Sequence, residues 1–297
     1  YAWLHDTLQR QLANYRQNGL LGDTSHFGNP VSSTSAQTGF DIQIHIGAGA
    51  YICGEESALI ESLEGKRGIP RIRPPFPAQS GFRNKPTVVN NVETFCAVTW
   101  IQLNSAEAFA AKGTETSRGT KLHSVSGDCE KPGIYELPMG TTVAQLLALC
   151  DARNTQAVQV GGPSGRLLFP EAFDTAIDFA HVSSGGSFMV FSDQRKILDI
   201  LRNFAHFFAH ESCGFCTPCR AGTQNIAHML DRIEVQSVHP SVQRDLQELA
   251  QLLQVTSHCG LGQTAASALS DYMQQRPQEF AKLCNSETLP VFLRAQP

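Results

Sequence analysis

Three cysteines follow one another at equal spacing in a short stretch, and a fourth lies further along the chain. The stretch Glu211–Arg220 reads ESCGFCTPCR and contains Cys213, Cys216 and Cys219, while Cys259 belongs to the stretch SHCGLG. Three closely spaced thiolates in a loop with glycine and proline can bind three iron corners of a 4Fe-4S cubane, and a thiolate from another element can bind the last corner. The spacing therefore predicts one 4Fe-4S cluster and a role in electron transfer.

The same cysteines could instead hold a tetrahedral zinc ion, because His210, His228 and His258 lie near them in the sequence. Structural zinc sites usually combine two separated C-x2-C pairs. Here three cysteines share one uniform spacing, and four are present without any histidine. We therefore favour the cluster, and the alternative from another class is a non-catalytic scaffold stapled by zinc.

The composition is that of a globular protein in a reducing compartment. The 297 residues carry a net charge of -4, which argues against a nucleic-acid binder. No apolar run approaches the roughly 20 residues that a membrane span needs. The nine cysteines are odd in number, which argues against a disulfide scaffold and favours the cytoplasm. We expect four of the remaining cysteines to be packing residues: Cys96, Cys129, Cys150 and Cys284.

A glycine-rich stretch, GAGAYICGEE, lies between a predicted strand and a predicted helix. Residues 42–46 alternate between isoleucine and polar side chains, as in a strand, and the helix is expected to stop at Gly65. Ile52 occupies the third glycine position of G-x-G-x-x-G, so the dinucleotide-binding fingerprint is not met. The carboxylates of Glu55 and Glu56 could bind hydroxyl or ring N–H groups of a ligand, or cap the helix.

Further along, the stretch NNVET places Asn90, Asn91 and Thr94 before an apolar helix. Their amide and hydroxyl groups could contact a ligand at the helix start, and plain N-capping explains them nearly as well.

The pattern of the chain changes twice, which indicates three parts. From Lys121 to about Ser192, short strands are predicted at 122–126, 133–137, 157–160 and 187–191, around one helix capped at Thr141 or Thr142. This pattern is typical of a small α+β unit of the β-grasp kind. Beyond Asp193 the apolar residues recur at helical spacing, which predicts a helical bundle.

Several stretches resemble one known family over essentially the whole chain. GAGAYICGEESAL, RPPFPAQSGF, PTVVNNVET, ESCGFCTPCRAG and SHCGLGQTA are similar to the flavin-binding, NADH-oxidising subunit of respiratory complex I and related enzymes. Within this family, SVSGDCEKPGIYE, AVQVGGPSG and FFAHESCG most resemble the diaphorase subunit of the soluble NAD-reducing nickel-iron hydrogenases. The flavin subunit of NAD-dependent formate dehydrogenase is close behind.

The resemblance implies a domain order and a set of cofactors. Residues 1–115 would be the C-terminal part of a Rossmann-like FMN- and NAD-binding domain, 116–192 a β-grasp (ubiquitin-like) domain, and 193–297 a bundle carrying the 4Fe-4S cluster. Carried over by motif, Cys213, Cys216, Cys219 and Cys259 would bind the cluster. The FMN and NAD(H) sites would use Gly54, Glu55, Glu56, Phe76, Asn90, Asn91 and Thr94, with Glu56 orienting the nicotinamide and Phe76 packing on the adenine.

The implied reaction is hydride exchange between NAD(H) and FMN, followed by single-electron transfer to the cluster. The expected enzyme is the NADH dehydrogenase (diaphorase) module of a hydrogen:NAD+ oxidoreductase, whose partners are iron-sulfur and hydrogenase subunits. A formate dehydrogenase or complex I subunit is the alternative. The family's glycine-rich loop lies upstream of the residue matching Tyr1, so we expect an incomplete flavin pocket and no NADH oxidation by this chain alone.

Overall fold

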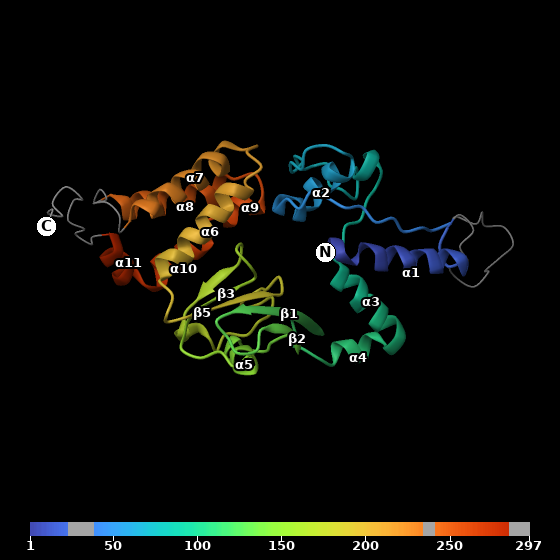
Figure 1. The fold of residues 1–297 in the computed structure, drawn as a ribbon, viewed down its shortest axis with the longest axis horizontal. Helices are drawn as coiled ribbons and strands as arrows, with labels where there is room; N and C mark the ends of the chain where they lie inside the picture. Colours follow the sequence, from blue (N-terminus) through green and yellow to red (C-terminus); the bar gives the residue numbers. More distant parts are fainter. Residues whose placement is uncertain (23–38, 234–240, 285–297) are drawn as a thin grey trace.

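A computed structural model describes residues 1–22, 39–233 and 241–284 (Figure 1). The helices are α1 (His5–Gln17), α2 (Glu56–Leu63), α3 (Val92–Asn104), α4 (Ala106–Ala110), α5 (Val143–Leu149), α6 (Ile197–Glu211), α7 (Thr217–Arg232), α8 (Val242–Thr256), α9 (Gly260–Thr264), α10 (Ser267–Gln275) and α11 (Pro277–Cys284). The strands are β1 (Thr120–Gly127), β2 (Gly133–Pro138), β3 (Thr155–Val160), β4 (Arg166–Leu168) and β5 (Ser187–Ser192).

The first part of the chain contains helices but no strand of a sheet among its described residues. Helices α1 and α2 form where the apolar spacing predicts them. The predicted strand at 42–46 is wrong, because this segment is irregular, and among the described residues the pairing nearest to it is a single bridge between Gly22 and Phe40. A strand needs a neighbour that accepts and donates its backbone hydrogen bonds. In the described part of the chain no neighbour pairs with 42–46, and Ile42 and Ile46 are exposed.

Helix α3 is rich in apolar residues, yet none of its residues is buried. Val92, Phe95 and Leu103 are exposed, and so is Cys96. The prediction that Cys96 packs in a core is therefore wrong, since Cys96 is exposed in an open hollow that it lines with Phe109 and Leu122. The same prediction is confirmed for Cys150 and for Cys284, which are buried, whereas Cys129 is only half-buried.

The central part is a five-stranded mixed sheet in the order β2-β1-β5-β3-β4. Strands β1 and β5 are parallel, and the remaining neighbours are antiparallel. Thr142 caps α5 through a capping box with Gln145, which confirms one of the two predicted cap positions. Helix α5 buries Val143 and Leu146 in a core that includes Phe188 of β5. The predicted strands are confirmed here because each alternates between this core and the other face of the sheet.

The last part is the predicted helical bundle, with α6 packed on α7 and α7 packed on α8 (Figure 1). Leu201, Phe208, Leu230, Leu246 and Leu253 meet in its core. Among the described residues, no helix is both long enough and apolar enough to cross a membrane.

A carboxylate of the bundle binds donors of the sheet and so connects the two parts. The Arg166 guanidinium on β4 donates to both oxygens of Asp271 on α10, with Nε at 2.9 and 3.0 Å and Nη2 at 2.7 Å. The backbone N–H of Leu167 donates to the same carboxylate at 2.8 Å. Asp271 is only 4% exposed, so these donors replace the water that its charge would otherwise need.

We expect Asp271→Ala to destabilise the chain, because it leaves the buried Leu167 N–H without an acceptor. An unsatisfied buried donor costs about 1–3 kcal/mol in the free energy of unfolding, and urea unfolding measures this loss. Arg153→Ala is the control, since it removes an exposed ion pair with Asp151, and exposed ion pairs contribute little to stability. Equal urea midpoints for the two variants would contradict the assigned role of Asp271.

The buried His123 on β1 makes the stability depend on pH. Burial lowers the pKa of His123, and the nearby Lys121 charge adds to this effect while Glu93 opposes it. Below about pH 6.5 the His123 imidazole binds a proton in the unfolded chain, but in the folded chain it stays neutral to lower pH. The free energy of unfolding therefore falls as the pH drops. We expect His123→Phe to remove up to about 1.4 kcal/mol per pH unit of this slope, as measured by urea unfolding between pH 7 and 5. The exposed His45→Phe serves as control, and a slope that His123→Phe leaves intact would overturn the assignment.

Candidate metal centre

The structure brings the four predicted cysteine ligands together at one end of the bundle. Cys213 and Cys216 lie in the loop between α6 and α7, Cys219 lies in the first turn of α7, and Cys259 is the residue before α9. All four line one small cavity. The other lining residues are mostly apolar: Ile52, Pro70, Ser212, Phe215, His258 and Leu261.

The local sequence explains how the loop presents its thiols. Gly214 has a φ of +77°, a left-handed conformation that glycine adopts without strain, and it turns the chain after Cys213. Pro218 stands in the first turn of α7, where its missing N–H costs nothing and its fixed φ suits a helix start. The Cys219 thiol therefore projects from a rigid helical turn.

Two of the four thiols, Cys219 and Cys259, have a raised pKa. Burial raises the pKa of Cys219 to about 11, and the charges of Cys216, Cys259 and Cys213 act in the same direction. Burial also raises the pKa of Cys259, with the charges of Cys213 and Cys216 adding to it. Thiolates are the form that binds metal, so this cavity favours thiolates only when a cation shares it.

The donor set fits a cluster better than a single zinc ion. In tetrahedral zinc sites the Zn–S distance is about 2.3 Å, which places the sulfurs about 3.8 Å apart. Within residues 1–22, 39–233 and 241–284, no three His, Cys, Asp or Glu side chains are grouped closely enough to hold one metal ion. His258, a candidate zinc ligand, packs its ring 5.3 Å from the Phe215 ring and places Nε2 3.3 Å from the Arg71 carbonyl.

A buried hydroxyl beside the cysteines supports the same fit. Ser257 is 6% exposed, and its Oγ has no hydrogen-bond partner among the described residues. A Cβ placed on Gly262 would lie 2.5 Å from this Oγ and 3.0 Å from Cys219 Cβ, so the hydroxyl lies close to Cys219. An unpaired buried hydroxyl is costly, and the sulfurs of a cluster are the acceptors that this place would supply.

The other wall of the cavity comes from the segment around α2, some 150 positions earlier in the chain. The Tyr51 N–H donates to the Glu211 carboxylate at 3.1 Å, and the Tyr51 ring packs edge-on against Phe207 at 5.0 Å. Arg67 donates to the Cys213 carbonyl at 2.6 Å. These contacts hold Ile52, which is buried, against the metal cavity.

The carboxylates predicted to face a flavin are engaged within the protein. Glu55 caps α2 by accepting from the N–H groups of Ser57 at 3.0 Å and Ala58 at 2.9 Å. Glu56 pairs with Arg73 at 2.8 Å. For Glu55 the structure therefore shows helix capping, one of the two roles that its position in the sequence left open.

The remaining predicted flavin and nucleotide residues make their own local contacts or are exposed. Asn91 caps α3 by accepting from the N–H and hydroxyl groups of Thr94 at 3.0 and 2.7 Å. Asn90 and Gly54 are exposed, and Phe76 is 52% exposed in the proline-rich loop. In the part of the chain that the structure describes, no hydrogen bond or ion pair joins these residues to Glu55 or Glu56.

Ser212 and Pro70 line the metal cavity, and their positions in the sequence did not single them out as site residues. Ser212 immediately precedes Cys213, so its proximity to a ligand was the available signal. Pro70 carries no such signal, because only the packing of two distant segments brings it to the cavity.

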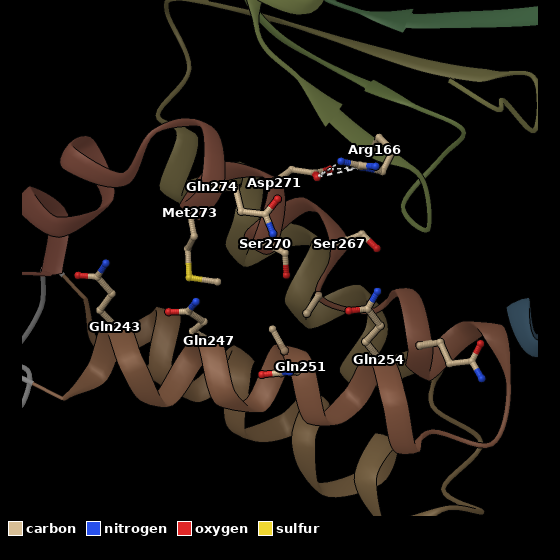
Figure 2. A pocket seen from close by; sticks show the side chains of 13 residues that line it. Arg166, Gln243, Gln247, Gln251, Gln254, Ser267, Ser270, Asp271, Met273 and Gln274 are labelled. Carbon is tan, nitrogen blue, oxygen red and sulfur yellow. Dashed lines mark hydrogen bonds and ion pairs between the residues drawn. The ribbon is translucent and has the colours of Figure 1, made fainter. Parts of the chain in front are cut away.

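A second, wider cavity among the described residues lies elsewhere. It has a volume of about 510 Å³ and lies between α8 and α10, where Figure 2 shows the side chains of Gln247, Gln251 and Gln254 facing Ser267 and Ser270. Its charged groups are Arg166 and Asp271, which are paired with each other. The cavity contains none of the four cysteines, so its size does not make it the site of the chemistry.

Comparisons with known proteins match two separate family models to this chain, one to its first part and one to the helices that carry the cysteines. A model of the Nuo51 FMN-binding domain matches residues 4–100, and a model of the NADH-ubiquinone oxidoreductase-F iron-sulfur binding region matches residues 199–283. The NAD-reducing hydrogenase HoxS subunit alpha of Cupriavidus necator is 44% identical over 98% of this chain and 48% of its own length. The NADP-reducing hydrogenase subunit HndC of Solidesulfovibrio fructosivorans is 37% identical over 96% of this chain and 59% of its own length.

A crystal structure of an NAD+-reducing [NiFe]-hydrogenase in the H2-reduced state is similar in fold. It matches 95% of this chain with a TM-score of 0.84 and 40% identity, and the match covers 48% of that hydrogenase chain. The chain studied here therefore spans about half the length of these hydrogenase relatives.

We expect Cys259→Ala to lose most of its bound iron, because it removes the ligand that comes from a separate element. Iron per chain after anaerobic purification measures the loss. Cys284→Ala is the matched control, since Cys284 is equally buried but belongs to α11, outside the metal cavity. Full iron content in Cys259→Ala would show that this cysteine is not a ligand.

Proposed function

Because this chain belongs to the family that includes the F subunit of NADH-quinone oxidoreductase and the alpha subunit of NAD-reducing hydrogenase, we propose that it is the cluster-bearing part of a diaphorase subunit. The proposed activity is hydride exchange between NAD(H) and FMN, followed by the passage of single electrons to a 4Fe-4S cluster. FMN, when bound, supplies the conversion between the two-electron chemistry of nicotinamide and the one-electron chemistry of the cluster.

The observation that carries the proposal is the cavity lined by Cys213, Cys216, Cys219 and Cys259. Its wall includes Ile52, which stands two positions before Gly54 and the two glutamates. A ligand held at the start of α2 would therefore lie close to the cluster, with buried apolar side chains excluding water from the space between them.

The glycines of the same segment favour a ligand at this face. A Cβ placed on Gly47 or Gly54 would meet no described atom within 4 Å, whereas one on Gly68 would lie 2.6 Å from the Cys53 sulfur. Gly49 is explained by its φ of +81°, which favours glycine. Packing within the described residues therefore explains the glycine at 68 but not those at 47 and 54. A glycine with open space beside it lets a cofactor approach the backbone closely.

We assign the site residues as follows. The FMN site uses Gly54, Glu55, Asn90, Asn91 and Thr94. In the NAD(H) site Glu56, which Arg73 holds in place, orients the nicotinamide, and the exposed Phe76 ring packs on the adenine.

The domain division proposed above is part of this assignment: residues 1–115 contribute to the FMN domain, 116–192 form the β-grasp domain and 193–297 form the cluster-bearing bundle. The strand order with a parallel central pair and one helix across the sheet supports the second of these. We further propose iron-sulfur and hydrogenase subunits as partners, and a cytoplasmic location, which the nine unpaired cysteines support.

The metal content tests the cluster directly. We expect about four irons and four acid-labile sulfides per chain in anaerobically purified protein, because a cubane contains four of each. Stoichiometric zinc without sulfide would overturn the proposal in favour of a zinc-stapled scaffold. The co-purified complex is then assayed for reduction of NAD+ with hydrogen and with formate. The electron donor that supports the reaction decides whether the subunit belongs to a hydrogenase or to a formate dehydrogenase.

We expect Phe76→Ala to raise the KM for NADH about tenfold in the intact complex, with a smaller change in kcat. Loss of an aromatic stacking partner costs about 0.5–1.5 kcal/mol beyond the buried area, and 1.4 kcal/mol corresponds to a tenfold change in affinity. Val88→Ala, which alters a side chain that is 81% exposed in the same region, is the control. An unchanged KM in Phe76→Ala would remove Phe76 from the nucleotide site.

A further inference from the structure

A serine hydroxyl lies against the most deeply placed cysteine of the cavity. Ser212 Oγ is 3.2 Å from Cys219 Sγ, within hydrogen-bonding distance for sulfur. Cys219 is 5% exposed, so water cannot compete well for this contact. When Cys219 is a thiolate ligand its sulfur carries no proton, and the serine must then be the donor.

The loop holds the hydroxyl in this orientation. The Gly214 N–H donates to Ser212 Oγ at 3.3 Å, which occupies an acceptor position on the oxygen and leaves the hydroxyl hydrogen for the sulfur. The Ser212 N–H donates to the Phe208 carbonyl at 3.1 Å and so fixes the serine at the end of α6. The Gly214 N–H thus donates to the Ser212 hydroxyl, and the hydroxyl donates to the Cys219 sulfur.

Ser212 also stands between two hollows of the molecule. It lines the cavity of the four cysteines, and it lines an outer cleft together with Ala48, Gly49 and Ala50 of the glycine-rich segment. Ser212 therefore lies between the cavity of the cluster ligands and the proposed flavin segment.

We propose that Ser212 is a positioning residue that raises the reduction potential of the cluster by donating a hydrogen bond to the Cys219 thiolate. Reduction adds negative charge that spreads onto the cysteine sulfurs, so a donor to one sulfur stabilises the reduced state more than the oxidised state. This inference rests on the proposed cluster, and it adds a residue that sets how readily the cluster accepts an electron.

The test is an EPR redox titration of the intact complex with Ser212→Ala. The signal of this cluster is the one that Cys259→Ala removes, which separates it from the signals of partner subunits. We expect the ratio of reduced to oxidised cluster at a fixed potential to fall at least threefold, which is about 28 mV since tenfold equals about 59 mV for one electron. Ser212→Thr, which keeps the hydroxyl, is expected to restore the wild-type ratio.

Thr217→Val is the matched control, because it deletes a hydroxyl from the first residue of α7, where the hydroxyl accepts from Arg220 rather than contacting a sulfur. An unchanged potential in iron-loaded Ser212→Ala, or an equal shift in Thr217→Val, would overturn the inference. Absence of the cluster from the wild-type protein would instead refute the proposed function.

If Ser212→Ala does not take up iron, the hydrogen bond is tested by pulsed EPR of the reduced wild-type protein. Spectra in H2O and in D2O show whether an exchangeable proton is coupled to the cluster. A strongly coupled exchangeable proton at this cluster, kept in Ser212→Thr, supports the hydrogen bond. The lack of any such proton contradicts it.

Discussion

The cluster site depends on the packing of two segments that are far apart in the sequence. The loop with Cys213 and Cys216 closes a cavity only because the segment around α2 lies against it, with Ile52 and Pro70 in the wall. The Tyr51 N–H to Glu211 and Arg67 to the Cys213 carbonyl are the polar contacts that fix this packing. Because the same segment leads into Gly54, Glu55 and Glu56, one interface serves both the cavity and the proposed flavin face.

The cluster ligands could be predicted from the sequence because their signal is local. A C-x2-C-x2-C spacing already states how three thiols are placed, and Cys259 follows in a second glycine-containing stretch. The strands and the capped helix at Thr142 were predictable for the same reason, since alternation and a capping residue act over a few positions. What the local pattern could not provide is the other wall of the cavity, which only tertiary packing brings there.

The wrong predictions concern features that depend on contacts with other parts of the chain rather than on the local sequence. Residues 42–46 alternate like a strand, but alternation becomes a strand only beside a partner, and the described chain pairs none with them. Cys96 looked like a packing residue because α3 is apolar, yet that helix buries none of its residues. Periodicity shows which face of an element can be covered, and it does not show that another element covers it.

Two arginines bind backbone carbonyl groups of the cysteine loop and so fix the orientation of its peptides. Arg67 binds the Cys213 carbonyl and Arg220 binds the Gly214 carbonyl, each at 2.6 Å. In a trans peptide the N–H points opposite to the carbonyl. Holding these carbonyls outward therefore turns the next N–H groups away from the arginines, and the Gly214 N–H does point to Ser212 Oγ.

The Gly214 N–H is directed at Ser212 Oγ rather than at a thiol, and it leaves the serine hydroxyl hydrogen for the Cys219 sulfur. The backbone therefore acts on this ligand through the serine. Burial raises the pKa of Cys219 and of Cys259, so the thiolates that a cluster needs depend on its positive iron ions sharing the cavity.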